Sequence, residues 1–146
     1  MRNFAIRSRL ALTVAAAMVV VVVVVALWWT KTIAFTKTAV VEFSTHQPSD
    51  GSVSFNLIDV EAAPDDLRKT AELLAQTRGG SASDYESDLT ITSATDVSGL
   101  AVTARGRTPD AARSLATDAA VLLSSYLTEA NAAHPNGFTF TVVPAR

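Results

Sequence analysis

An uninterrupted apolar run at residues 10–29 constrains this chain more than any other feature. The run reads LALTVAAAMVVVVVVVALWW, with Thr13 as its one hydroxylated residue and no charged residue. A helix of this length extends for about 30 Å, which matches the hydrocarbon thickness of a bilayer. The seven consecutive valines favour a helix in lipid, where every backbone polar group must be bonded internally. The run therefore predicts a transmembrane helix over 10–29.

The residues that flank this run predict its orientation. Three arginines precede it, namely Arg2, Arg7 and Arg9. Lys31 and Lys37 form a weaker basic flank on the other side. The positive-inside rule then places residues 1–9 in the cytoplasm as a short tail and the rest of the chain outside.

The end of the run bears on whether it is retained. Trp28 and Trp29 fall where the interfacial aromatic belt belongs, and Lys31 follows as an interface anchor. A cleaved signal peptide is the competing interpretation, but its apolar core spans about 7–15 residues and precedes a small-x-small site. Here the run is longer and only residues 32–34 resemble such a site. We expect a retained anchor and a single-pass plasma-membrane protein.

Charge is distributed unevenly along the chain, although the formal net charge is only −2. Residues 1–37 carry five basic residues and no acidic one, whereas residues 38–146 carry seven basic and all 14 acidic residues. An acidic domain offers no basic face to replace phosphate counterions, so nucleic acid is excluded as a partner. The chain has no Cys, which excludes disulfides and thiolate metal sites. We expect a linker over 30–37 and an acidic extracytoplasmic domain over 38–146.

Hydrophobic periodicity predicts that this domain is α+β. Alternating apolar residues indicate strands, which we expect over 36–44, 53–60, 88–93, 98–105 and 138–143. Apolar residues at spacings of three and four indicate helices, which we expect over 64–78 and from Thr108-Pro109 to about residue 132. Pro64 suits the start of the first helix and Gly79-Gly80 suits its end. Residues 79–87 are expected to form a flexible loop.

This order of elements predicts a fold class. A single transmembrane helix would be followed by a ferredoxin-like, split β-α-β domain with both helices on one face of the sheet. The second helix would pack on the sheet through an apolar stripe: Ala112, Leu115, Ala119, Leu122, Tyr126 and Ala130. The other face would carry Thr90, Thr92, Thr103, Thr139 and Thr141. Threonine at these positions suits either a solvated β-surface or a subunit interface.

No residue pattern in the sequence predicts catalysis. His46 and His134 have no second ligand at metal-binding spacing, and neither a Walker loop nor a nucleophile elbow occurs. Carboxylates cluster only at a helix start and in a loop, at Asp65, Asp66, Asp84, Glu86 and Asp88. A domain this small hardly frames the cleft of a glycosidase. We therefore predict a non-enzymatic protein without a metal or other cofactor.

Two arginines are candidates for an anion contact. Arg105 and Arg107 precede the helix that begins after Thr108, and helix N-termini bind anions through their N–H groups. Charge at a strand end combined with helix capping is the simpler explanation of the same residues.

Several segments taken in chain order carry a resemblance to a known family. They are the apolar run, the strand TAVVEFS, the strand LAVTARG, the segment TPDAARSLATDAAVLLSSYL and the closing VVPAR. The residues in comparable places are Pro109, Ala112, Ala116, Ala120, Tyr126, Pro144 and Ala145. The chain resembles the N-terminal region of Wzz-type chain-length determinants, the polysaccharide co-polymerases, and notably actinobacterial capsular polysaccharide biosynthesis proteins.

The resemblance implies a non-enzymatic, membrane-anchored oligomeric scaffold in cell-envelope polysaccharide biosynthesis or export. Members of that family usually continue into a second membrane span and often a kinase part, whereas this sequence ends at Arg146. The expectation is a single-span form without a kinase. The alternative is a single-span assembly subunit of another envelope complex, of secretion or pilus type. The expected partners are the membrane, proteins of the envelope complex and a second copy of the chain in a homo-oligomer.

Overall fold

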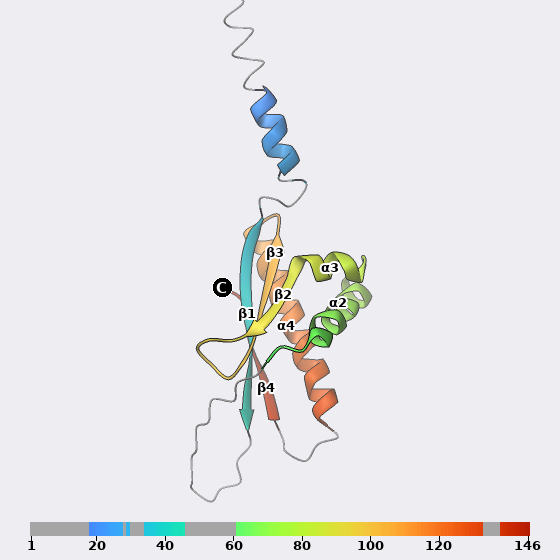
Figure 1. Cartoon of the computed structure of the whole chain (residues 1–146), viewed down its shortest axis with the longest axis vertical. Helices are drawn as coiled ribbons and strands as arrows, with labels where there is room; N and C mark the ends of the chain where they lie inside the picture. The colour runs from blue at the N-terminus through green and yellow to red at the C-terminus, as the bar shows by residue number, and fades with distance from the viewer. Residues whose placement is uncertain (1–17, 28, 30–33, 46–60, 133–137) are drawn as a thin grey trace, which may run out of the picture. The chain divides into compact units, whose positions relative to one another are not determined.

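A computed structural model describes residues 18–27, 29, 34–45, 61–132 and 138–146 (Figure 1). The chain divides into two compact units, Met1–Ala34 and Phe35–Arg146. The second unit contains all the strands described below, and its first strand includes the last three residues of the predicted linker over 30–37.

In the first unit, the described helix covers residues 18–27 and residue 29 is also helical. Within the described residues, no helix is both long enough and apolar enough to cross a membrane. This finding contradicts the predicted transmembrane helix over 10–29 and the predicted single-pass plasma-membrane location.

The second unit is α+β and contains a four-stranded antiparallel sheet. The strands are β1 (Phe35–Thr45), β2 (Leu89–Ser93), β3 (Gly99–Gly106) and β4 (Phe138–Val143), in the sheet order β2-β3-β1-β4. Every neighbouring pair is antiparallel. Consequently β1 and β2 run in the same direction with β3 between them, which is a split β-α-β connection. The correction to the predicted fold class therefore concerns its membrane-spanning part, and the α+β class is confirmed.

The strands form where apolar and polar residues alternate. Ala39 and Val41 of β1 and Leu100 and Val102 of β3 point to one face and are buried. β1 pairs with β3 from Phe35↔Gly106 to Glu42↔Gly99. It pairs with β4 from Val40↔Val143 to Thr45↔Phe138. β2 pairs with β3 from Leu89↔Ala104 to Ser93↔Leu100. Four predicted strands are observed within one residue of their expected bounds. The fifth, over 53–60, lies outside the described residues.

The two predicted helices are α2 (Pro64–Arg78) and α4 (Pro109–Asn131). Each begins with a proline preceded by a capping contact. The Asp66 carboxylate accepts a hydrogen bond from the Ala63 N–H at 3.0 Å, and Thr108 Oγ1 accepts one from the Ala111 N–H at 3.1 Å. Gly79 ends α2 with a φ of +78°, a conformation that glycine adopts without steric penalty.

The predicted flexible loop over 79–87 is wrong, because Ala82–Asp88 forms the helix α3. Tyr85 anchors this helix. Its ring packs against the hydrophobic core and its hydroxyl donates to the Gly79 carbonyl at 2.8 Å. The segment lacks an apolar stripe, so periodicity could not reveal a helix held by one aromatic side chain.

The helices cover one face of the sheet (Figure 1). α4 packs on β1, β3 and β4, and α2 packs on α4 and β2. The side chains that α4 buries are Ala112, Leu115, Ala116, Ala119, Ala120 and Leu123. The predicted stripe is correct through Ala119, but Leu122 and Tyr126 are only half-buried and Ala130 is exposed. At 3.6 residues per turn the buried stripe continues through Ala120 and Leu123, and Leu122 and Tyr126 lie beside α2 instead.

Candidate binding surfaces

The sheet face opposite the helices is a candidate binding surface of the described residues. We call it the open sheet face. It comprises Thr36, Thr38, Val40, Glu42 and Ser44 of β1, Thr90 and Thr92 of β2, Ala101, Thr103 and Arg105 of β3, and Thr139, Thr141 and Val143 of β4. All are exposed or half-buried, whereas Ala39 and Val41 of β1 and Leu100, Val102 and Ala104 of β3, which alternate with them, are buried. The predicted threonine-rich face is therefore present.

The open sheet face is less polar than its threonine content suggests. The hydroxyls of Thr38 and Thr103, which pair across β1 and β3, hydrogen-bond to each other at 2.8 Å. Because each hydroxyl already has a hydrogen-bond partner, a molecule that covers this face need not supply one. The threonine methyl groups remain available for contact. Val40 lies in register with both Ala101 and Val143, so an apolar row crosses the middle of the face. Methyl groups thus dominate its centre.

The charged side chains on the open sheet face lie near its opposite ends. Glu42 pairs with Gly99, and Arg105 pairs with Thr36, six residues away along β1. At about 3.3 Å per residue, the two positions are roughly 20 Å apart. Of the described residues on this face, only these two carry a formal charge.

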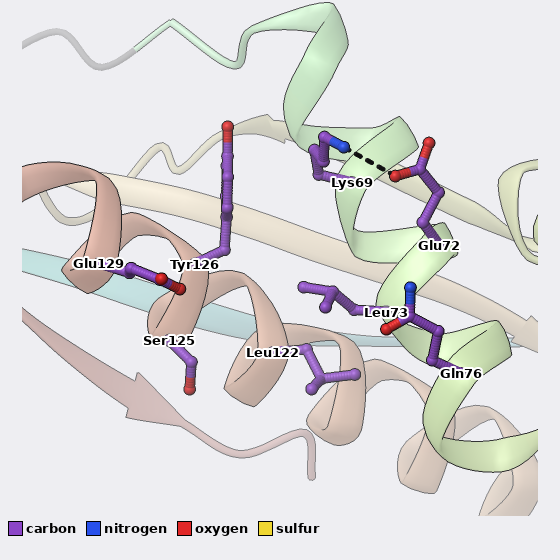
Figure 2. A pocket seen from close by; sticks show the side chains of 8 residues that line it. All are labelled: Lys69, Glu72, Leu73, Gln76, Leu122, Ser125, Tyr126 and Glu129. Atoms are coloured by element: carbon purple, nitrogen blue, oxygen red, sulfur yellow. Dashed lines mark hydrogen bonds and ion pairs between the residues drawn. The ribbon is translucent and has the colours of Figure 1, made fainter.

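A groove of about 230 Å³ separates α2 from α4 on the outer side of the helical layer (Figure 2). Its lining residues are Lys69, Glu72, Leu73, Gln76, Leu122, Ser125, Tyr126 and Glu129. The Lys69 ammonium donates to Glu72 Oε2 at 2.9 Å, and this hydrogen bond is the main cause that lowers the pKa of Glu72. The volume lies below the usual range for small-molecule sites, about 300–1,000 Å³.

The groove lacks the arrangement that nucleophilic catalysis requires. Its serine, Ser125, donates its hydroxyl to the Val121 carbonyl at 3.0 Å and therefore has no general base as a partner. Two carboxylates, Glu72 and Glu129, come from opposite walls, but one of them is already paired with Lys69. Among the described residues, no group of His, Asp or Glu side chains is arranged to hold a metal ion.

The anion contact at Arg105 and Arg107 stays a prediction, and the structure places Arg105 away from α4. Arg105 projects from the open sheet face, whereas α4 packs on the other face. At the start of α4, Thr108 already accepts from the Ala111 and Ala112 N–H groups, and Pro109 has no N–H. These contacts occupy two of the N–H groups on which the anion hypothesis depends.

Most of the predicted membrane residues cannot be placed. Arg2, Arg7, Arg9, Trp28 and Lys31 lie outside the described residues, as do His46 and His134. Trp29 is helical and 66% exposed.

The sequence predicted the threonines of β2, β3 and β4 but did not single out Thr36, Thr38 or Glu42. Their signal was present, because alternation through Ala39 and Val41 places the even-numbered residues of β1 on the opposite face. The groove residues had no comparable signal, since its walls belong to two helices far apart in sequence.

Comparison with known proteins gives no relative: no family model, no curated protein and no solved structure matches this chain.

Proposed function

We propose that this protein is a non-enzymatic scaffold in cell-envelope polysaccharide biosynthesis or export, and that it self-associates through the open sheet face. The observation that carries the proposal is a four-stranded face with an apolar centre, which the described helices of the second unit leave uncovered. The polysaccharide context is supported by the resemblance of the segment from Pro109 to Ala145 to Wzz-type proteins. The absence of a nucleophile with a base in the groove favours a scaffold over an enzyme.

A second copy fits this face by charge. Two such sheets can stack face to face about 10 Å apart, with a two-fold axis that lies between them and perpendicular to the strands. The strands of one copy then run opposite to the same strands of the other copy. Glu42 of one copy then lies over the end of the partner's sheet that carries Arg105. The symmetry produces this contact twice, and the apolar row through Val40 meets its counterpart between the two contacts.

Charge reversal tests the self-association. Sedimentation velocity of the full chain should show a dimer, and Glu42→Arg should shift it to monomer because like charges then meet at both ends. Combining Glu42→Arg with Arg105→Glu should restore the dimer, since the charges are exchanged and remain complementary. Glu129→Arg in the groove is the matched control and should leave the dimer intact. A wild-type monomer at all concentrations, or a Glu42→Arg dimer, would exclude this interface.

Deletion of the gene tests the polysaccharide role. A scaffold of the export complex should change the length distribution of surface glycan, measured by gel electrophoresis of the extracted polymer. Complementation with the Glu42→Arg variant should fail, and complementation with Glu129→Arg should succeed. If glycan length is unchanged while secretion or piliation fails, the protein is an assembly subunit of another envelope complex.

A further inference from the structure

Strand β1 is longer than the strands beside it, and this leaves part of one edge without a partner among the described strands. β1 pairs with β3 from Phe35 to Glu42 but with β4 only from Val40 to Thr45. On the β4 side, no described strand pairs with residues 35–39. In Figure 1 the upper part of β1 runs beside β3 above the end of β4.

The direction of the backbone groups along this edge follows from one hydrogen bond. The Phe43 N–H donates to the Ser98 carbonyl at 2.8 Å, on the β3 side of β1. Because successive residues of a strand direct their N–H and C=O groups to opposite sides, odd-numbered residues of β1 face β3 and even-numbered residues face β4. Thr36 and Thr38 therefore direct their N–H and C=O groups toward the open edge.

Two features of the chain after β4 explain why the ladder stops. Pro144 follows Val143 and ends the strand. Ala145 would face Thr38 if the register continued, but its N–H donates to Thr117 Oγ1 on α4 at 3.3 Å. Ala145 is also buried in the core, with 7% of its surface exposed. The chain thus turns toward the helical layer and leaves the backbone of Thr36 and Thr38 without a strand partner among the described residues.

We propose that residues 35–39 of β1 form a docking site for an extended peptide strand that carries an acidic residue opposite Lys37. Strand addition would satisfy the backbone groups of Thr36 and Thr38 and would extend the sheet beyond β4. Lys37 lies between these two residues and is the charged residue of the segment. In an antiparallel pairing it occupies a position where the opposing Cα atoms are only about 4.5 Å apart, so an opposing carboxylate is favoured.

The same position of Lys37 argues against a second copy as the occupant. Antiparallel pairing of two such edges centred on Lys37 would place two ammonium groups directly opposite each other, which is unfavourable. The outer strands β2 (LTITS) and β4 (FTFTVV) contain no charged residue and therefore offer no charge to select a partner. Selectivity for an acidic strand is accordingly specific to the open edge of β1.

Amide hydrogen exchange of the ¹⁵N-labelled full chain tests the proposal. The probe is the peptide acetyl-Thr-Val-Glu-Val-Thr-amide, whose glutamate faces Lys37 when its two valines pair with Thr36 and Thr38. At saturating peptide, exchange of the Thr36 and Thr38 amides should slow by about tenfold or more. The same peptide N-methylated at both valines lacks the required N–H donors and should give no protection.

Charge variants identify the site. Lys37→Glu should reverse the preference, so that the peptide with lysine in place of glutamate binds better than the original. Lys69→Glu, a matched reversal on α2, should leave the preference unchanged. Glu42→Arg should bind the peptide as the wild type does, which separates this site from the open sheet face.

Three outcomes would overturn the proposal. One is that the peptide leaves the exchange of both amides unchanged. Another is that both amides are protected in the free chain at every concentration, which would mean that the edge is already paired within the molecule. The third is protection without peptide that increases with chain concentration in the Glu42→Arg variant, in which the open sheet face no longer dimerises; this would identify a second copy as the occupant of the edge.

Discussion

At the scale of single residues, the Glu72 carboxylate shows how one contact changes a titration. The hydrogen bond from Lys69 is the largest cause of its lowered pKa, and the charges of Lys69 and Arg68 act in the same direction. The folded-state pKa therefore lies below the unfolded-state value. The stability from this pair is present above the ordinary pKa of 4.5 and is lost as the pH falls through the lower, folded-state pKa.

Lys69→Met should raise the pKa of Glu72 toward its ordinary value, because it removes both the hydrogen bond and the nearby positive charge. The measurement is a carboxyl ¹³C NMR titration between pH 2 and 7. Arg113→Met is the control: Arg113 pairs with Asp110 at 3.0 Å and should not affect Glu72. An unchanged Glu72 pKa in Lys69→Met would show that the pair does not persist in solution.

At the scale of elements, the start of α4 depends on the hydroxyl of Thr108. Its Oγ1 accepts from the Ala111 N–H, one of the amides that the helix itself leaves without an acceptor. Thr108→Ala should lower the free energy of unfolding by about 1 kcal/mol, measured by urea denaturation. Thr108→Ser keeps the oxygen and should retain most of that stability. Equal losses in both variants would place the effect in the threonine methyl group and not in the cap.

Elements with redundant local signals were predictable from sequence. α2 and α4 combine an opening proline with long apolar periodicity, and β4 alternates over its whole length. α3 has only Tyr85 as an anchor, so its helix depends on tertiary contacts that no local pattern encodes. The membrane-spanning helix was predicted from the composition of 10–29, but within the described part of the chain no helix is long and apolar enough to cross a membrane.

Of the candidate sites, too, one was predictable from local sequence and one was not. The open sheet face was predictable because the two-residue period of a strand assigns each threonine to a face. The open edge of β1 was not, since it depends on where β4 stops and on the bond from Ala145 to Thr117. The relative lengths of paired strands are a property of the assembled sheet and cannot be read from one segment.

At the scale of the whole molecule, one hydrophobic core joins the sheet to its helices. The buried cluster includes Val41 of β1, Leu74 of α2, Leu100 of β3 and Leu123 of α4, and Tyr85 of α3 packs against it. The sheet and both long helices thus contribute fully buried side chains to the same cluster. We therefore expect Phe35–Arg146 to unfold in a single cooperative transition.

Leu123→Ala should lower the free energy of unfolding by about 2–5 kcal/mol, because Leu123 is fully buried and the surrounding side chains cannot fill the space that it leaves. Val121→Ala is the matched control on the same helix. Val121 is 47% exposed, and its truncation should change stability by no more than about 0.5 kcal/mol.

Far-ultraviolet circular dichroism follows the helices and sheet, and near-ultraviolet tyrosine signals follow Tyr85 and Tyr126. Since one core supports both, Leu123→Ala should shift the two unfolding curves together. Curves that separate in this variant would show that α3 and the outer helical layer unfold independently of the sheet.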